Sequence, residues 1–399
     1  MADQSDKDHL RLARVALAWL TEPGTRAVHQ LVSHVGPIEA LHQLLRGEVT
    51  DPTARSIATA RASAGDPYAV AEAALTRTER LGARVVIPED DEWPWPVEDL
   101  TRLRMPGADR AVDRETAPPL CLWVRGDHPL NEALDRSVAV VGARAATSYG
   151  VHVATELGYG LAEREWTVVS GGAYGIDAAA HRGALTAGGL TIAVLACGID
   201  RPYPVGNTAL FDRIGEHGLL ISEWPPGAEP LRHRFLIRNR VIAAATRGTV
   251  LVEAAARSGA MQTLRRALAL GRRAMVVPGP VTSALSVGVH ELLRESPDIR
   301  VVTGVPHVLE EVGRIGEDLA PRASGPRHPR DQLDDEAARL LEAVPGRGTV
   351  GAEELAIRAG VDLRTALRKL TLLEDLGLLV QRDGRYALTP QARRRPGSP

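Results

Sequence analysis

Lysine is nearly absent from this chain of 399 residues, since Lys7 and Lys369 are the only two. The Walker A motif of P-loop ATPases needs a lysine after its glycines, and Schiff-base catalysis needs a lysine nucleophile. Residues 8–368 therefore support neither chemistry. Nearly all basic residues are arginines, whose planar guanidinium groups suit bidentate phosphate contacts and stacking on bases.

Other absences narrow the class of protein further. The two cysteines, Cys121 and Cys197, have neither metal-site nor disulfide spacing, and we expect both to be buried and no metal or cofactor to be bound. No run of 18 apolar residues occurs, and the first ten residues lack a signal-peptide pattern, so we expect a cytoplasmic protein. The net charge is −2, so a nucleic-acid surface must be a local patch.

Residues 137–181 carry the main positive signal. Two apolar runs, 138–141 and 167–169, end in the small-residue turns Gly142-Ala143-Arg144 and Ser170-Gly171-Gly172, and each turn precedes a helical pattern. Such runs are typical of strands in a parallel α/β sheet. A glycine turn at a helix start lets an anion approach the free amides, although each turn alone equally fits a tight connection that binds nothing.

Strand and helix patterns alternate over residues 137–303, which predicts a doubly wound, mostly parallel, extended Rossmann-like sheet. The expected strands are 138–142, 167–170, 190–196, 218–222, 249–252, 274–278 and 299–302. The expected helices include 148–164, 175–187, 206–216, 235–246 and 259–271. The functional loops should lie along one edge of this sheet.

The rest of the chain divides into further segments. Residues 1–80 predict a small bundle of short helices, and 81–312 predict the sheet domain. Residues 313–332, rich in proline, glycine and charge, predict a linker. Residues 333–391 predict three helices and a hairpin turning at Asp383-Gly384, the winged-helix arrangement, and 392–399 a basic disordered tail.

The winged helix leaves its ligand open, because such domains contact either duplex DNA or proteins. We expect its third helix to present Arg364, Arg368 and Lys369 outward.

Positive charge is concentrated in residues 231–273, which contain ten arginines and one acid, Glu253. Cations around an aromatic ring are typical of single-strand binding, where arginines contact phosphates and the ring stacks on a base. Alternatively, the ring packs in the core and the arginines are merely solvated. The arginines that flank Phe235 and Asn239 are Arg232, Arg234, Arg238 and Arg240.

A third helix start, Ser258-Gly259, follows another strand of the same sheet. Three helix starts in a row beside clustered arginines suit a polymer with repeating phosphates better than a mononucleotide.

Several ordered motifs within about 115–300 resemble the DprA/Smf family of bacterial DNA-processing proteins. They are VVGAR followed by SGGAYGIDAAAH, then ACGIDRPYPVGN, RHRFLIRNRVIAAAT and VLVEAAARSGAMQTLRRALALGRRAMVVPGP. The resemblance implies a non-enzymatic homodimer that binds single-stranded DNA and hands it to the RecA recombinase during natural transformation. It also implies a SAM-like or helix-hairpin-helix fold for the first 80 residues.

The candidate DNA-binding residues, from the turns, the arginine cluster and the resemblance together, are Gly142, Arg144, Ser170, Gly171, Gly172, Tyr174, Arg232, Arg234, Phe235, Arg238, Asn239, Arg240, Ser258 and Gly259. Glu253 would shape this site. Three residues depart from the family pattern: Tyr174 replaces a common arginine, Arg232 replaces a lysine, and His290 replaces an asparagine.

Two alternatives remain. One is a nucleotide phosphoribohydrolase of the lysine-decarboxylase-like LOG group, with Asp177 as a general acid–base residue, although the expected PGGxGTxxE is absent. The other is a nucleotide-sensing transcription regulator that uses the winged helix on duplex DNA.

Overall fold

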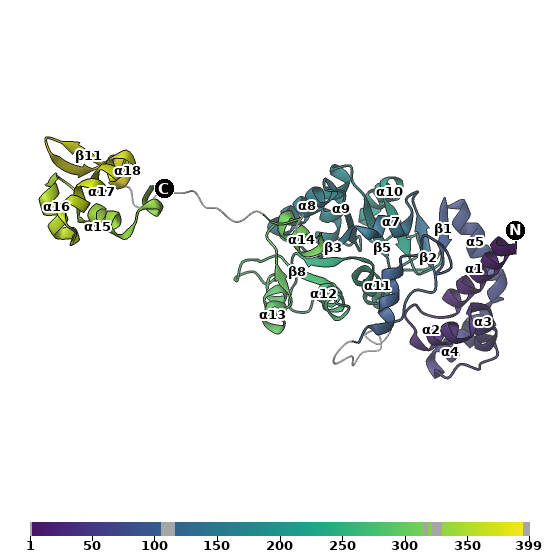
Figure 1. Cartoon of the computed structure of the whole chain (residues 1–399). Helices are drawn as coiled ribbons and strands as arrows, with labels where there is room; N and C mark the ends of the chain where they lie inside the picture. Colours follow the sequence, from purple (N-terminus) through teal and green to yellow (C-terminus); the bar gives the residue numbers. More distant parts are fainter. Residues whose placement is uncertain (1, 105–115, 315–317, 321–328, 394–399) are drawn as a thin grey trace. The chain divides into compact units, whose positions relative to one another are not determined.

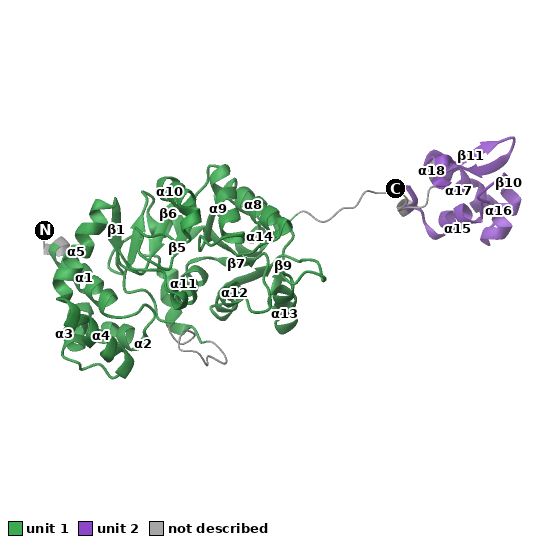
Figure 2. Ribbon diagram, turned by 180° about the vertical axis from the view of Figure 1, so that it is seen from behind, with its two compact units in different colours: residues 1–320 green, residues 321–399 purple. Residues whose placement is uncertain are grey.

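The structure, a computed structural model, describes residues 2–104, 116–314, 318–320 and 329–393. The chain forms two compact units, Met1–Ala320 and Pro321–Pro399 (Figure 2). Parts of the expected linker and most of the expected basic tail, including Arg394 and Arg395, lie outside the described residues.

In the first unit, the described strands form one sheet in the order β1-β2-β6-β5-β4-β3-β7-β8-β9. The strands β3 to β9 pair in parallel, whereas β2 is antiparallel to β6 and β1 to β2. The extended Rossmann-like sheet is thus confirmed. Its strands are β1 Ala83–Val86, β2 Leu122–Arg125, β3 Ser137–Val141, β4 Thr167–Ser170, β5 Thr191–Leu195, β6 Leu219–Ser222, β7 Gly248–Leu251, β8 Arg273–Val276 and β9 Arg300–Val301.

Helices cover both faces of the sheet because its strands are apolar on both sides (Figures 1 and 2). On β3, Val138 and Val140 pack under α8, α9 and α14, while Ala139 and Val141 pack under α11, α12 and α13. The helices that follow β3 in the first unit are α8 Ser148–Ala162, α9 Ile176–Thr186, α10 Thr208–His217, α11 Arg232–Ala245, α12 Gly259–Ala269, α13 Val287–Glu295 and α14 Val305–Val312.

The N-terminal helices are α1 Ala2–Leu20, α2 Arg26–Val35, α3 Pro37–Leu45, α4 Pro52–Ala64 and α5 Pro67–Arg80. Their core continues into the sheet, since Leu17 and Leu41 belong to the same buried cluster as Trp123 and Leu195. The helical segment therefore packs as part of the first compact unit.

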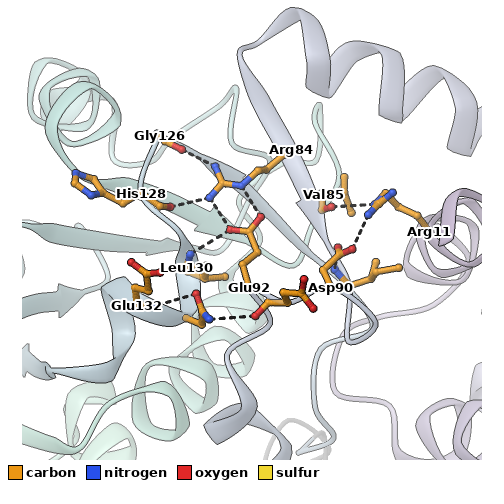
Figure 3. Close-up of polar contacts among 12 residues, drawn as sticks. Arg11, Arg84, Val85, Asp90, Glu92, Gly126, His128, Leu130 and Glu132 are labelled. Atoms are coloured by element: carbon orange, nitrogen blue, oxygen red, sulfur yellow. Dashed lines mark hydrogen bonds and ion pairs between the residues drawn. The ribbon is translucent and has the colours of Figure 1, made fainter. Parts of the chain in front are cut away.

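Polar contacts attach α1 and the acidic loop of residues 89–96, which contains Trp93 and Trp95, to the outer strand β1 (Figure 3). Arg11 donates to the carbonyl of Val85 at 3.2 Å and to Asp90 at 2.7 Å. Arg84 pairs with both oxygens of Glu92 at 2.7 and 2.8 Å. Side chains thus cover part of the sheet edge that would otherwise offer free backbone groups to another strand.

The second unit is a winged helix, as expected. It contains α15 Asp335–Ala343, β10 Val350–Gly351, α16 Ala352–Ala359, α17 Leu363–Asp375, β11 Leu379–Arg382 and β12 Arg385–Leu388. Asp383 and Gly384 turn the hairpin with φ of 50° and 75°. One expectation for α17 is wrong: Lys369 is bonded to Asp334 and largely covered, so only Arg364 and Arg368 are exposed.

No helix within the described residues is both long and apolar enough to cross a membrane. Over the same residues, no group of three or more His, Cys, Asp and Glu is placed to hold a metal ion.

Candidate nucleic-acid interface

The predicted turns meet at the carboxyl edge of the sheet. Strand β3 lies between β4 and β7, so the chain continues to one side of β3 first and returns to the other side later. At such a switch point, loops diverge and leave a crevice. A cavity of about 260 Å³ opens there. Its lining includes Gly142, Arg144, Ala173, Asp177, Phe235, Leu236, Arg238, Asn239, Ser258, Gly259 and Thr263.

Several backbone amides of the turns are already bonded within the protein. The amides of Gly171 and Ala173 donate to Oδ2 of Asp177 at 3.2 and 3.3 Å. The amide of Ala143 donates to the carbonyl of Glu253 at 2.8 Å. The expectation that the glycine turns offer free amides to phosphate is therefore wrong for these donors.

The glycines of these turns are required by protein packing. A Cβ on Gly142 would lie 2.6 Å from Ile176, and one on Gly172 would lie 2.3 Å from the ring of Phe211. Gly172 also has a φ of 69°. Ser170 is fully buried and donates through Oγ to the carbonyl of Val140 at 2.6 Å. Ser170, Gly171 and Gly172 thus support the cavity from below the surface.

Arg238 connects α11 to the ends of β4 and β5. Its guanidinium donates to the carbonyls of Gly171, at 3.0 Å, and Val194, and only 4% of the residue is exposed. Burial lowers its pKa to about 10. Burial also raises the pKa of Asp177, opposed by Arg238 and by the two amides that Asp177 accepts. We read this buried pair as the floor of the cavity.

Two arginines expected to contact DNA are instead buried in ion pairs. Arg240 is fully buried and donates to both oxygens of Glu223 at 2.6 and 2.7 Å. Arg234 pairs with Glu22 at 2.9 Å and lies over the ring of Trp224. Their guanidinium groups are not available at the surface, so the structure assigns them a role in holding α11 in place.

Much of the positive charge predicted for residues 231–273 is also paired, here mostly at the surface. Arginines from the 231–273 segment also pair with carboxylates elsewhere in the chain, namely Arg247 with Asp135, Arg265 with Glu295, Arg272 with Asp99 and Arg273 with Glu311. The local charge excess therefore does not form a continuous cationic surface.

Three exposed arginines remain near the cavity: Arg144 in the turn after β3, Arg232 at the start of α11, and Arg257 just before α12. None of them has a carboxylate partner among the described residues. Each comes from a different segment, and of the three it is Arg144 that lines the cavity, while Arg232 and Arg257 are close in sequence to the lining residues Phe235 and Ser258. Free guanidinium groups at this position are suited to phosphate contacts.

Aromatic rings accompany these cations. Cζ of Arg144 lies 5.3 Å from the ring centroid of Phe235. Tyr203 meets the same ring edge-on, with the centroids 5.7 Å apart and the planes at 61°. Tyr174 is 49% exposed and Tyr203 is 44% exposed. Sequence reasoning did not select Tyr203 as a site residue, although the connection between β5 and α10 that carries its Tyr-Pro pair begins at the carboxyl end of a strand.

The remaining candidates connect the helices that frame the opening. Asn239 accepts from Nε of Arg238 at 3.2 Å and approaches the carbonyl of Gly259 with Nδ2 at 3.5 Å. Ser258 caps α12 by accepting from the amide of Ala260. Glu253, buried, accepts from the amide of Thr147 at 2.9 Å and so positions the start of α8.

Residues 84–313 match the model of the DNA recombination-mediator protein A family. This chain belongs to that family. The putative DNA processing protein DprA of Mycobacterium tuberculosis is 44% identical over 390 residues, which are 97% of this chain and 95% of that protein. The DNA processing protein DprA of Streptococcus pneumoniae is 38% identical over 222 residues, 56% of this chain and 72% of that protein.

A solved structure supports the same assignment. The X-ray structure of DprA from Streptococcus pneumoniae has a TM-score of 0.59 and 31% identity, and the match covers 75% of this chain and 96% of that one. In the second unit, residues 348–395 match the HemN C-terminal domain. The family model thus matches the sheet domain, whereas the Mycobacterium tuberculosis relative aligns over nearly the whole chain, the C-terminal unit included.

Proposed function

We propose that this protein binds single-stranded DNA along the carboxyl edge of its Rossmann-like sheet and delivers the strand to the RecA recombinase. The observation that carries the proposal is the position of Arg144 beside the ring of Phe235 at the mouth of the switch-point cavity. A cation 5.3 Å from a ring centroid matches a phosphate and its neighbouring base.

The geometry favours a single strand over a duplex or a free nucleotide. The rings of Phe235, Tyr174 and Tyr203 can stack on bases only when those bases are unpaired. The cavity of about 260 Å³ is slightly smaller than ligand pockets usually are, which begin at about 300 Å³. The exposed arginines belong to three separate segments, and of these only Arg144 lines the cavity itself, so we infer a ligand that extends beyond the cavity and is longer than one nucleotide.

We further propose a protein without catalytic activity. Asp177, the acidic side chain lining the cavity, is buried and accepts two backbone amides, so it lacks the freedom of a general acid–base residue. Incubation with nucleoside monophosphates tests this point: we expect no release of free base, and clear turnover would favour the phosphoribohydrolase alternative.

Transfer to RecA, a homodimeric state and a cytoplasmic location are proposals that rest on family membership. Light scattering coupled to size-exclusion chromatography tests the dimer, and co-purification with RecA in the presence of oligonucleotide tests the partner. A monomer at micromolar concentration would remove the dimer from the proposal.

The central experiment is a titration with single- and double-stranded oligonucleotides of the same length at two salt concentrations. We expect tighter binding of the single strand and a loss of affinity as salt rises, because bound phosphates release counterions. Preferential binding of duplex, abolished by deletion of residues 331–399, would instead support the transcription-regulator alternative.

A further inference from the structure

Aromatic residues are scarce in this protein, yet three of them gather at one place. The chain has six tyrosines and two phenylalanines. Tyr203 contacts the ring of Phe235, and Tyr174 lies over Gly206, where an added Cβ would be 2.4 Å from the tyrosine hydroxyl oxygen. We call Phe235, Tyr203 and Tyr174 the aromatic rim. It combines α11, the β5–α10 connection and the β4–α9 turn.

The rim is held by a well-bonded connection. After Tyr203, the short helix η2 Val205–Asn207 ends in Asn207, which is 2% exposed and donates to the carbonyl of Gly172 at 3.0 Å. Before Tyr203, Asp200 accepts from the amide of Gly227 at 2.8 Å. Both ends of the segment are thus fixed to other parts of the sheet edge. A ring presented on such a segment needs little ordering when a ligand binds.

From this geometry we infer that Tyr203 is a second base-stacking residue, so that two consecutive bases of a bound strand stack on separate rings. The inference rests on the proposed function and extends it. Phe235 alone would hold one base, and its ring is already approached by Arg144 and Tyr203. Tyr203 keeps 44% of its surface exposed, which leaves ring area for a base of its own. The protein is therefore selective for unpaired bases as well as for phosphates.

A structural role for Tyr203 predicts something different. If Tyr203 only held Phe235 in position, its loss would weaken the stacking of one base, the one on Phe235. A second stacking residue contacts a different base. The two roles are therefore distinguished by which nucleotide of the strand each ring contacts.

The test uses the full chain and an oligothymidylate of about six nucleotides, near the lower end of known site sizes. A strand this short keeps one position on the protein, because any shift along the site would lose phosphate contacts. One abasic residue is moved through the strand, and affinity is measured by fluorescence anisotropy. In the wild type we expect two positions at which the missing base weakens binding about tenfold each. Tyr203→Ala should remove the penalty at one of them and Phe235→Ala at the other.

Two further variants serve as controls. Tyr203→Phe keeps the ring and should retain both sensitive positions. Tyr159→Ala removes an exposed tyrosine near the far end of α8 and should behave as the wild type. A single sensitive position in the wild type, or loss of the same position in both alanine variants, overturns the inference and leaves strand binding intact. Failure of the wild type to bind the unmodified strand overturns the proposed function itself.

Discussion

The guanidinium carbon of Arg144 lies 5.3 Å from the ring centroid of Phe235. Arg144 belongs to the turn after β3, and Phe235 to α11, more than 90 residues later in the chain. The sheet topology brings them together because β3 is the neighbour of β7, the strand that follows α11. A cation and a stacking surface are thereby placed side by side at the edge where ligands of this fold bind.

The pair of Arg240 and Glu223 predicts a stability effect. Arg240→Ala leaves the Glu223 carboxylate buried without its partner, so we expect a loss of about 3–5 kcal/mol in the free energy of unfolding. Urea unfolding followed by tryptophan fluorescence measures it for the first unit alone, because all six tryptophans lie within residues 1–320.

The double variant Arg240→Met with Glu223→Leu provides the control. Removing both charges together should recover much of the loss, since the cost arises from the unpaired carboxylate. If Arg240→Ala unfolds at the same urea concentration as the wild type but binds DNA more weakly, the guanidinium of Arg240 contacts the DNA instead.

His181 predicts a pH dependence. Burial lowers its pKa to about 3, so between about pH 6.5 and 3 only the unfolded chain takes up this proton. Stability should therefore fall as pH falls, by about 1.4 kcal/mol per pH unit from this residue. The hydroxyl of Thr191 donates its hydrogen to the carbonyl of Val168, so its oxygen accepts from Nδ1–H of His181. An asparagine at position 181 can replace this donor with its side-chain amide.

His181→Asn isolates this contribution from those of the carboxylates. Between about pH 7 and pH 5, the variant should lose about 2 kcal/mol less than the wild type. Urea unfolding at several pH values measures this difference. If the free energies of unfolding of variant and wild type change in parallel with pH, His181 takes up its proton in the folded protein as well.

Gly206 predicts an effect on binding that is separate from folding. In Gly206→Ala the new methyl group displaces the ring of Tyr174, which is half exposed and free to turn outward. We expect stability within about 0.5 kcal/mol of the wild type, as for surface substitutions, and weaker binding of oligothymidylate.

Tyr174→Ala is the matched comparison. The double variant with Gly206→Ala should bind no more weakly than Tyr174→Ala alone, because both changes remove the same ring from the rim. Additive losses would mean that Gly206 acts through the backbone.

Local sequence patterns were sufficient for the parallel strands of the sheet, β3 to β9. Strand β3 was expected at 138–142 and lies at Ser137–Val141, and β4 lies where it was expected. Strands buried on both faces require continuous apolar runs, and the turns after them require small residues, so both features are visible along the chain. The crevice at the carboxyl edge then follows from the strand order.

Charge counting failed where partners are distant in sequence. Glu22 neutralises Arg234 across 212 positions, and Asp135 neutralises Arg247 across 112. No local pattern announces these pairs, because only the folded chain brings them within bonding distance. The amides of the second glycine turn were misjudged for a related reason: the side chain of Asp177, already recognisable as a helix-start residue, bonds back to them.

The most direct measurement compares two arginines of the same charge cluster in their binding to oligothymidylate over a range of salt concentrations. Arg232 is exposed without a carboxylate partner among the described residues, whereas Arg247 is paired with Asp135. Arg232→Ala, and likewise Arg144→Ala, should weaken binding and reduce the slope of log affinity against log salt by about one. Arg247→Ala should leave both unchanged. Equal behaviour of Arg232→Ala and Arg247→Ala, or an unchanged slope in all three variants, would contradict a strand-binding site at the carboxyl edge of the sheet.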